Sequence, residues 1–332
     1  MKTLLEEPLQ KAVAPEGGAR SIAELLLKYY IQVLLVIAVV ILSVVNPNFR
    51  RLGNYANILL QSSFAGIGAA GMTLLIIAGA FDLSVAGILG VCGIALALLS
   101  PVSPTLIALL ATLVIGVALG LLNGFVVTKM RIPAFIATLG MMNVYLGVAF
   151  IATQGQVLGI TSRVLRALGT DALLGVLPIP FLIMIVVYAL CALFLGRTVY
   201  GRYVRAIGSS ETASRAVGIP VNRIKVVSFM IVGVCTSIAG ILLAGELSSA
   251  NAIMASGYEL NAIAIVVVGG TSLKGGSGTL FGSFTGALFF AVINNALNIF
   301  GVGAYWQYVI SGLLLISAVG IEVIRKYVRG AD

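Results

Sequence analysis

Charged side chains are scarce in this sequence of 332 residues. Asp, Glu, Lys and Arg together make up 9% of the chain, and His is absent. Soluble globular domains carry about 25% charged residues. Hydrophobic residues account for 60% of the chain. A soluble protein of this size could not bury so much apolar surface, so the sequence predicts an integral membrane protein.

The shortage of His and Cys also limits the chemistry. Cys92, Cys191 and Cys235 each lie in an apolar stretch without CxxC spacing. We therefore expect small buried side chains and neither a disulfide nor a metal site. The sequence has no Ser/His pair and no carboxylate pair at fixed helical spacing, so we expect no enzymatic activity. It also lacks the GxxxxGK[ST] phosphate-binding motif, so we expect this chain to bind no ATP or other cofactor itself.

The apolar residues form long continuous runs, which indicate transmembrane helices; a β-barrel would show short alternating segments. The predicted fold class is therefore all-α, a polytopic bundle of about ten transmembrane helices. The expected helices are 29–46, 57–79, 84–100, 104–128, 133–152, 178–196, 225–245, 258–273, 279–299 and 305–324. They form a single membrane domain, 29–324, between terminal tails at 1–28 and 325–332.

Basic residues predict the orientation, because Lys and Arg near the ends of spans stay in the cytoplasm. With both termini in the cytoplasm, all but four of the 20 basic residues fall on that side. The four exceptions are Arg50, Arg51, Arg163 and Arg166; the last two lie in the longest outer loop, 153–177. The net charge of +9 is concentrated beside apolar spans, where anionic lipid is the ordinary partner, so we expect no nucleic-acid binding.

The longest polar segment between spans is 197–225, which is also rich in Arg. Ser209 or Ser210 can cap a short helix with an acidic residue in its first turn, and Gly218 can end that helix before Pro220. Its outward side chains would be Glu211, Thr212, Ser214 and Arg215. Two readings stay open, a solvated loop and a helix on which a cytoplasmic partner docks.

Four stretches of the sequence carry a resemblance. They read AFDLSVAGI (80–88), RAIGSSETASRAVGI (205–219), GYELNAIAIVVVGGTSLKGGSGTLFG (257–282) and INNALNIFGV (293–302). In this order they resemble the permease subunits of sugar ABC importers of the ribose, galactose and xylose type. The second stretch corresponds to the cytoplasmic coupling segment of that family. Ala80 and Ala86 stand where the family has Gly, Gly87 replaces a Ser, and Ser209–Ser210 replaces a frequent Gly-Asn pair.

The resemblance implies a multi-pass protein of the bacterial inner membrane that imports a neutral monosaccharide, with ribose as the default. It implies three protein partners: a second permease copy or paralogue, a cytoplasmic ATPase subunit that uses ATP and Mg²⁺, and a periplasmic sugar-binding protein. Closing of the ATPase dimer would push the coupling segment and switch the spans between outward-open and inward-open states. The residues of the coupling contact would be Arg202, Gly208, Glu211, Arg215 and Gly218. The binding protein would meet Arg50, Arg51, Arg163 and Arg166, for which lipid phosphate is the alternative partner.

Polar side chains within the spans are candidates for the substrate pathway. They are Asp82, Ser84, Asn143, Thr271, Ser272, Asn294 and Asn295, together with the adjacent Phe81. Asp82 either caps the following helix or faces the pathway. The amides either exchange hydrogen bonds with a sugar or join helices. The run 269–278 is too rich in Gly for a regular helix and predicts a break beside the passage or a cytoplasmic turn, loosely echoing 79–90.

Small residues recur at four-residue spacing along two of the predicted spans. The two sets are Gly116, Gly120 and Gly124, and Gly278, Gly282 and Gly286. Such faces allow close helix contact, so we expect packing within the subunit or at a permease dimer.

Three alternative functions remain. A permease of branched-chain amino-acid ABC importers shares the partner arrangement. A stand-alone secondary carrier or channel would need no ATPase, but ionisable groups near the spans are few: Asp82, Glu246 and Glu259. A membrane-embedded enzyme is the third.

Overall fold

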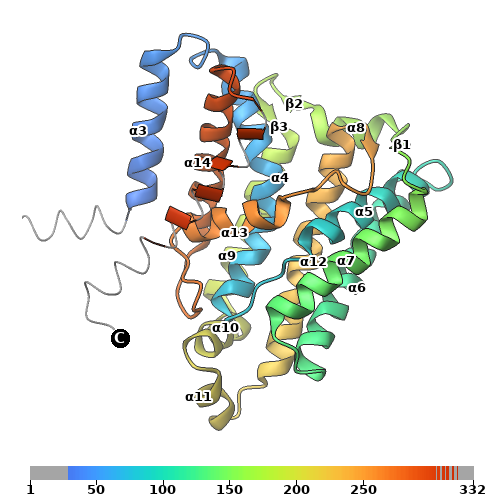
Figure 1. Cartoon of the computed structure of the whole chain (residues 1–332), viewed down its shortest axis with the longest axis vertical. Coiled ribbons are helices and arrows are strands. Elements are labelled where there is room, and N and C mark those ends of the chain that lie inside the picture. The colour runs from blue at the N-terminus through green and yellow to red at the C-terminus, as the bar shows by residue number, and fades with distance from the viewer. Residues whose placement is uncertain are drawn as a thin grey trace, which may run out of the picture.

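The computed structural model describes residues 29–303 and the scattered positions 305, 306, 309, 310, 312, 313, 316, 317 and 320. Both predicted tails and most of the tenth predicted helix lie outside the described residues. The helices are α3 (Tyr30–Val45), α4 (Leu52–Ile77), α5 (Val85–Leu99), α6 (Thr105–Lys129), α7 (Ala134–Thr153), α8 (Arg163–Thr170), α9 (Ile179–Arg197), α10 (Val199–Ser209), α11 (Glu211–Ala216), α12 (Val221–Glu246), α13 (Tyr258–Val268) and α14 (Leu280–Ile299). Figure 1 shows them as one helical bundle.

The all-α prediction is confirmed for the described part of the chain. Six helices, α4, α6, α7, α9, α12 and α14, are long and apolar enough to cross a membrane. The helices α3, α5 and α13 are apolar but shorter. The predicted total of ten spans and the cytoplasmic location of both termini stay predictions.

Helix boundaries differ from the prediction in three places. Helix α4 starts at Leu52 and α12 at Val221, each four or five residues early. Helix α13 ends at Val268, so its 11 residues extend only about 16 Å, half the thickness of a hydrocarbon core. Pro104, Pro133, Pro178 and Pro220 each directly precede a helix. Proline suits that position because no helical N–H is required there.

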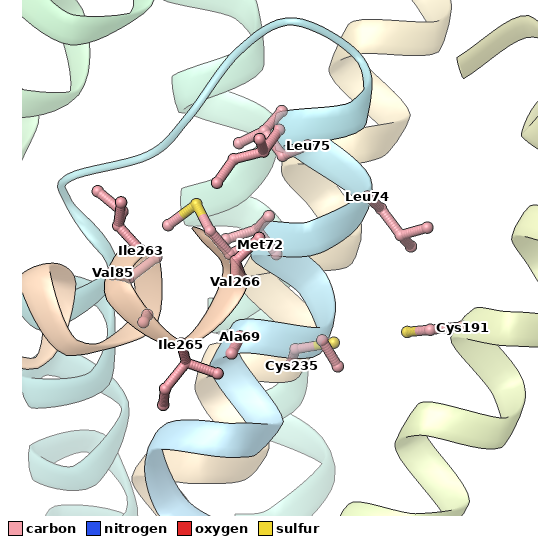
Figure 2. Close-up of a cluster of buried hydrophobic side chains, with 14 of the residues drawn as sticks. Ala69, Met72, Leu74, Leu75, Val85, Cys191, Cys235, Ile263, Ile265 and Val266 are labelled. Carbon is pink, nitrogen blue, oxygen red and sulfur yellow. The ribbon is translucent and has the colours of Figure 1, made fainter. Parts of the chain in front are cut away.

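Helix α4 forms the centre of the bundle. Every residue from Gly66 to Ala78 is buried, as expected for a helix that is apolar on all sides. Figure 2 shows its side chains beside those of α13 and near two cysteines: Met72, Leu74, Leu75, Ile263, Ile265, Val266, Cys191 and Cys235. The three cysteines are buried, as predicted. The outer faces of α3, α6 and α7 expose apolar side chains instead, and such surfaces suit lipid.

The small-residue faces pack helices within the subunit. A Cβ atom at Gly116 of α6 would lie 2.7 Å from the carbonyl oxygen of Gly233 in α12, and one at Gly120 would overlap the carbonyl oxygen of Phe229. On α14, a Cβ at Gly282 would overlap the Gly269 carbonyl, and one at Gly286 the Ile265 carbonyl. Only glycine permits these contacts, which confirms the packing prediction.

One end of the bundle, which we call the α8 end, carries short strands and a helix that the sequence did not predict. Strand β1 (Leu158–Gly159) pairs antiparallel with β4 (Ser249–Ala250), in the register Leu158 to Ala250 and Gly159 to Ser249. Strand β2 (Ala172–Leu173) pairs with β3 (Leu177–Pro178), Ala172 opposite Pro178. The range 153–177, predicted as a loop, contains α8, whose Leu165 is fully buried. Helices α10 and α11 lie at the opposite end, the α11 end (Figure 1).

Candidate functional site

Two non-helical segments meet near the α11 end. The first break, 78–84, separates α4 from α5, and the second break, 269–279, separates α13 from α14. Gly79, Gly275 and Gly276 have φ values of 77°, 91° and 76°, which side chains other than glycine rarely adopt. The Gly276 amide donates a hydrogen bond to the Ile77 carbonyl oxygen at 2.9 Å. The sequence predicted the non-helical character of the second break, but not this contact.

Helix α10 touches both breaks through Gly208. A Cβ atom at Gly208 would overlap the Ile77 carbonyl oxygen and the Gly276 amide nitrogen. A Cβ at Gly275 would lie 3.0 Å from both the Gly79 Cα and the Gly208 carbonyl oxygen. The Arg205 guanidinium also donates to the Gly278 carbonyl oxygen at 3.5 Å. The predicted coupling segment is therefore in backbone contact with both breaks.

Helix α11 forms where the sequence predicted a short helix. The Ser210 hydroxyl accepts a hydrogen bond from the Ala213 amide at 3.2 Å. Gly218, with φ of 81°, ends the segment before Pro220. One detail of the prediction was wrong: Ser214 is 3% exposed and faces the bundle. The cause is that α11 lies against α12 and buries its inner face.

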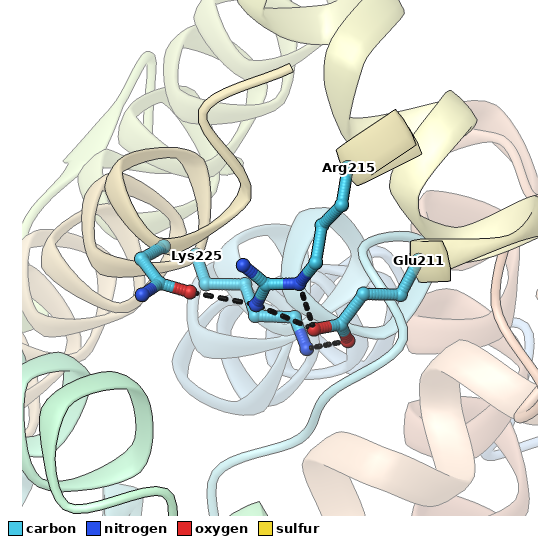
Figure 3. A network of polar contacts seen from close by, with 4 residues as sticks. Glu211, Arg215 and Lys225 are labelled. Carbon is cyan, nitrogen blue, oxygen red and sulfur yellow. Dashed lines mark hydrogen bonds and ion pairs between the residues drawn. The ribbon is translucent and has the colours of Figure 1, made fainter. Parts of the chain in front are cut away.

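Charged side chains join α11 to α12 (Figure 3). The Glu211 carboxylate accepts from Arg215 Nη2 at 2.8 Å and from Lys225 Nζ at 2.6 Å. Arg215 Nη2 also donates to Asn222 Oδ1 at 2.8 Å. The hydrogen bond from Lys225 lowers the pKa of the Glu211 carboxyl below its usual value, with help from Arg215 and against partial burial. Glu211 therefore stays ionised at neutral pH and holds the start of α12.

A cavity of about 560 Å³ lies between this ion-pair network and the first break. Gly79 and Ala80 line it on one side, and Glu211, Arg215 and Lys225 on another. Its remaining lining comes from the end of α6, the α6–α7 connection and Asn222. The charged side chains and the first break thus line one cavity at the α11 end.

Asp82 is fully buried at the start of α5. Its Oδ1 accepts from the Ser84 amide at 2.8 Å and the Ser84 hydroxyl at 2.7 Å, and its Oδ2 accepts from Asn123 Nδ2 at 2.9 Å. The Tyr145 hydroxyl donates to Asn123 Oδ1 at 2.8 Å, and the Thr138 hydroxyl accepts from the Leu83 amide at 3.1 Å. Asp82 therefore bonds the backbone at the helix start and also fixes the first break to α6 and α7.

The other predicted pathway residues do not gather around one cavity. Asn295 and Asn54 exchange amide hydrogen bonds at 2.8 and 3.0 Å, which join α14 to α4. Asn143 lies exposed on α7 and donates to the Leu139 carbonyl of its own helix. Thr271 and Ser272 are buried in the second break. Phe81 packs edge-on against Phe135, and Asn294 is half-buried on α14.

The predicted docking arginines are all exposed. Arg50 and Arg51 lie in the turn between α3 and α4, and Arg163 and Arg166 lie on α8. Both places are at the α8 end (Figure 1). Arg202 is exposed on α10 at the other end.

Several residues of the site were not predicted as such. Lys225 and Asn222 complete the Glu211 network, and Tyr145 and Thr138 complete that of Asp82. Their partners lie on other helices, so no local spacing signals them. Among the described residues, no group of three His, Cys, Asp or Glu side chains could hold a metal ion.

Comparisons with known proteins give a consistent result. The family model described as branched-chain amino acid transport system / permease component matches residues 54–319. The ribose import permease protein RbsC of Escherichia coli (strain K12) is 40% identical over 293 residues, which cover 87% of this chain and 91% of that protein. RbsC of Bacillus subtilis (strain 168) is 38% identical over 292 residues, covering 87% and 90%.

A third relative is named for a different sugar. The L-arabinose transport system permease protein AraH of Escherichia coli (strain K12) is 37% identical over 281 residues, covering 82% of this chain and 83% of that protein. No solved structure matches the chain. The resemblance to permeases of sugar ABC importers is confirmed by these matches. With its six apolar helices, this chain is a multi-pass membrane protein that belongs to the family of branched-chain amino acid transport system permease components.

Proposed function

We propose that this chain is the transmembrane permease subunit of a binding-protein-dependent ABC importer for a neutral monosaccharide, by default ribose. The observation that carries the proposal is the similarity to the ribose permeases over about nine-tenths of their length. In this proposal the chain catalyses no reaction and binds no cofactor. A separate ATPase subunit binds Mg²⁺ and hydrolyses ATP.

The geometry at the α11 end supports an ATPase-driven mechanism. The α10–α11 segment projects from the bundle (Figure 1), and through Gly208 it contacts the ends of both breaks. A push on this segment would reach α4, α5, α13 and α14 through backbone contacts that have no flexible side chain between them. Close-packed contacts of this kind transmit displacement because they cannot be compressed.

The ion pairs provide a second connection. Glu211 links α11 to Lys225 near the start of α12, and α12 packs along α6 through the glycine contacts. We assign Arg202, Gly208, Glu211, Arg215 and Gly218 to the ATPase contact and its transmission. The exposed arginines at the α8 end would meet carboxylates of a periplasmic binding protein, since Arg forms bidentate pairs with carboxylates. In this proposal the membrane is the bacterial inner membrane and the α11 end faces the cytoplasm.

The family description favours one alternative, a permease for branched-chain amino acids. The two functions differ in the substrate that is transported, so an uptake assay distinguishes them. In a strain without its own ribose and branched-chain amino acid uptake, the chain would be co-produced with its cognate ATPase and binding protein. We expect uptake of labelled ribose that unlabelled leucine does not reduce. Uptake of labelled leucine without ribose uptake would show that the sugar proposal is wrong.

A further inference from the structure

A second cavity opens beside the coupling segment, and among its lining residues Arg215 alone belongs to the proposed ATPase contact. This groove, of about 680 Å³, runs between α6 and α12 at the α11 end. Lys129, Arg223 and Arg215 contribute its three cations, and none of its lining residues is Asp or Glu. Its apolar part includes Leu121, Phe125, Val226 and Val227.

Charge and apolar surface are separated along the groove. Lys129 ends α6, and Leu121 precedes it by about two turns, which corresponds to about 12 Å along the helix. Arg223 lies in the first turn of α12, and Val226 and Val227 follow one turn further along the same helix. Both helices therefore place their cations at the α11 end and their apolar side chains toward the middle of the bundle.

The groove is open and its two outer cations are available. Leu121 is 45% exposed and Phe125 52%, which is unfavourable in water but suits a hydrocarbon chain. Lys129 and Arg223 are also exposed. The two ion pairs found within the described part of the chain both involve Glu211 and use Arg215 and Lys225. Lys129 and Arg223 thus have no carboxylate partner among the described residues.

We propose that this groove binds one anionic phospholipid. Its phosphate would lie beside Lys129 and Arg223, and an acyl chain would follow Leu121 and Phe125 along α6. A phospholipid matches both halves, since it carries a negative headgroup at the membrane surface and a hydrocarbon chain directed into the membrane. Arg215 and Asn222 line this groove and the coupling cavity alike, so the lipid would lie next to the Glu211 ion pairs.

Native mass spectrometry of the purified full chain tests the proposal without any transport step. Dioleoylphosphatidylglycerol and the zwitterionic dioleoylphosphatidylcholine would be titrated separately. We expect one tightly retained phosphatidylglycerol and weaker phosphatidylcholine. The double variant Lys129→Gln/Arg223→Gln should bind phosphatidylglycerol about 25-fold more weakly, because each basic residue near an anionic headgroup contributes about a five-fold gain in binding.

Two further variants make the result specific. Arg197→Gln/Lys274→Gln removes two exposed cations that do not line the groove and should leave tight binding unchanged. Leu121→Trp fills the apolar part without changing any charge and should also weaken phosphatidylglycerol binding. Thermal unfolding in detergent would show that each variant is folded.

Four outcomes would overturn the proposal. They are equal retention of the two lipids, an equal loss in the Arg197/Lys274 control, unchanged binding in Leu121→Trp, and competition by soluble glycerol phosphate at the same concentration as the lipid. A fifth contrary result is that Lys129→Gln/Arg223→Gln weakens binding of the ATPase subunit while phosphatidylglycerol is retained as in the unchanged chain. The groove would then be a protein contact.

Discussion

The Gly276 amide and the Ile77 carbonyl oxygen are hydrogen-bonded at 2.9 Å, which holds the end of α4 against the segment that leads into α14. Gly208 at the end of α10 fits onto this bond with no room for a Cβ atom. Three parts of the chain that are distant in sequence therefore meet backbone to backbone. This contact connects the coupling segment to the interior of the bundle.

Adding one methyl group at this contact should disturb transport. Gly208→Ala would force the Ile77 carbonyl and the Gly276 amide apart, and overpacking of this kind costs about 1–3 kcal/mol. We expect ATP-driven ribose uptake to fall by about tenfold or more. The matched control is Gly196→Ala in α9, where a Cβ would meet nothing within 4 Å. Equal uptake by the two variants would show that the Gly208 contact is not needed.

The Glu211 ion pairs predict a specific titration. Because the pKa of Glu211 is lowered from its ordinary value of 4.5, its stabilising effect is present at pH above 4.5 and is lost only as pH falls through the lower pKa of the folded protein. We expect the carboxyl ¹³C shift of Glu211, assigned by comparison with Glu211→Gln, to titrate with a midpoint below 4.5.

The variant Lys225→Met provides the control for this titration, because it removes the largest cause of the lowered pKa. Its Glu211 midpoint should move up toward the ordinary value. A midpoint that does not respond to the loss of Lys225 would contradict the observed contact between α11 and α12.

The buried Asp82 network distinguishes a positioning role from a role of charge in the pathway. Asp82→Ala leaves the Ser84 amide without its side-chain acceptor and removes one of the two acceptors of Asn123 Nδ2, which should destabilise the chain by about 1–3 kcal/mol. In Asp82→Asn the remaining amide oxygen can still accept from Ser84. We expect near-normal thermal stability in detergent and near-normal ribose uptake for this variant. Normal stability with lost uptake would instead show that the charge acts in the pathway.

The exposed arginines of α8 predict dependence on the binding protein. Arg163→Glu/Arg166→Glu reverses two charges at the α8 end and should remove most uptake that requires the binding protein, through repulsion of its carboxylates. Binding-protein-stimulated ATP hydrolysis by the assembled complex would be measured alongside. If both quantities keep their normal values, these arginines do not contact the binding protein, and lipid phosphate becomes their better partner.

Local features of the fold were predictable because each depends on neighbouring residues. Apolar runs predicted the helical spans, and the glycine run predicted the second break. Ser210 and Gly218 predicted the start and end of the short helix α11. Helix α8 was missed because its buried residues, Leu165 and Gly169, pack against the end of α12, which lies far away in the sequence.

Long-range contacts were not predictable from single positions. Asn295 is an amide in an apolar span whether it binds a sugar or pairs with Asn54, and only the fold brings that partner within 2.8 Å. Lys225 follows Glu211 by 14 residues, which would separate the two side chains by about 21 Å along a single helix. They meet because the chain breaks between α11 and α12. The sequence identified the residue types of the site, and tertiary structure selected their partners.

The central claim is that a separate ATPase drives transport through this chain. Its most direct test is labelled ribose uptake into vesicles that contain the chain, with binding protein and ATP present, in the presence and absence of the ATPase subunit. We predict ATP-dependent accumulation only when the ATPase subunit is present. Equal accumulation in its absence would contradict the account and identify a stand-alone carrier.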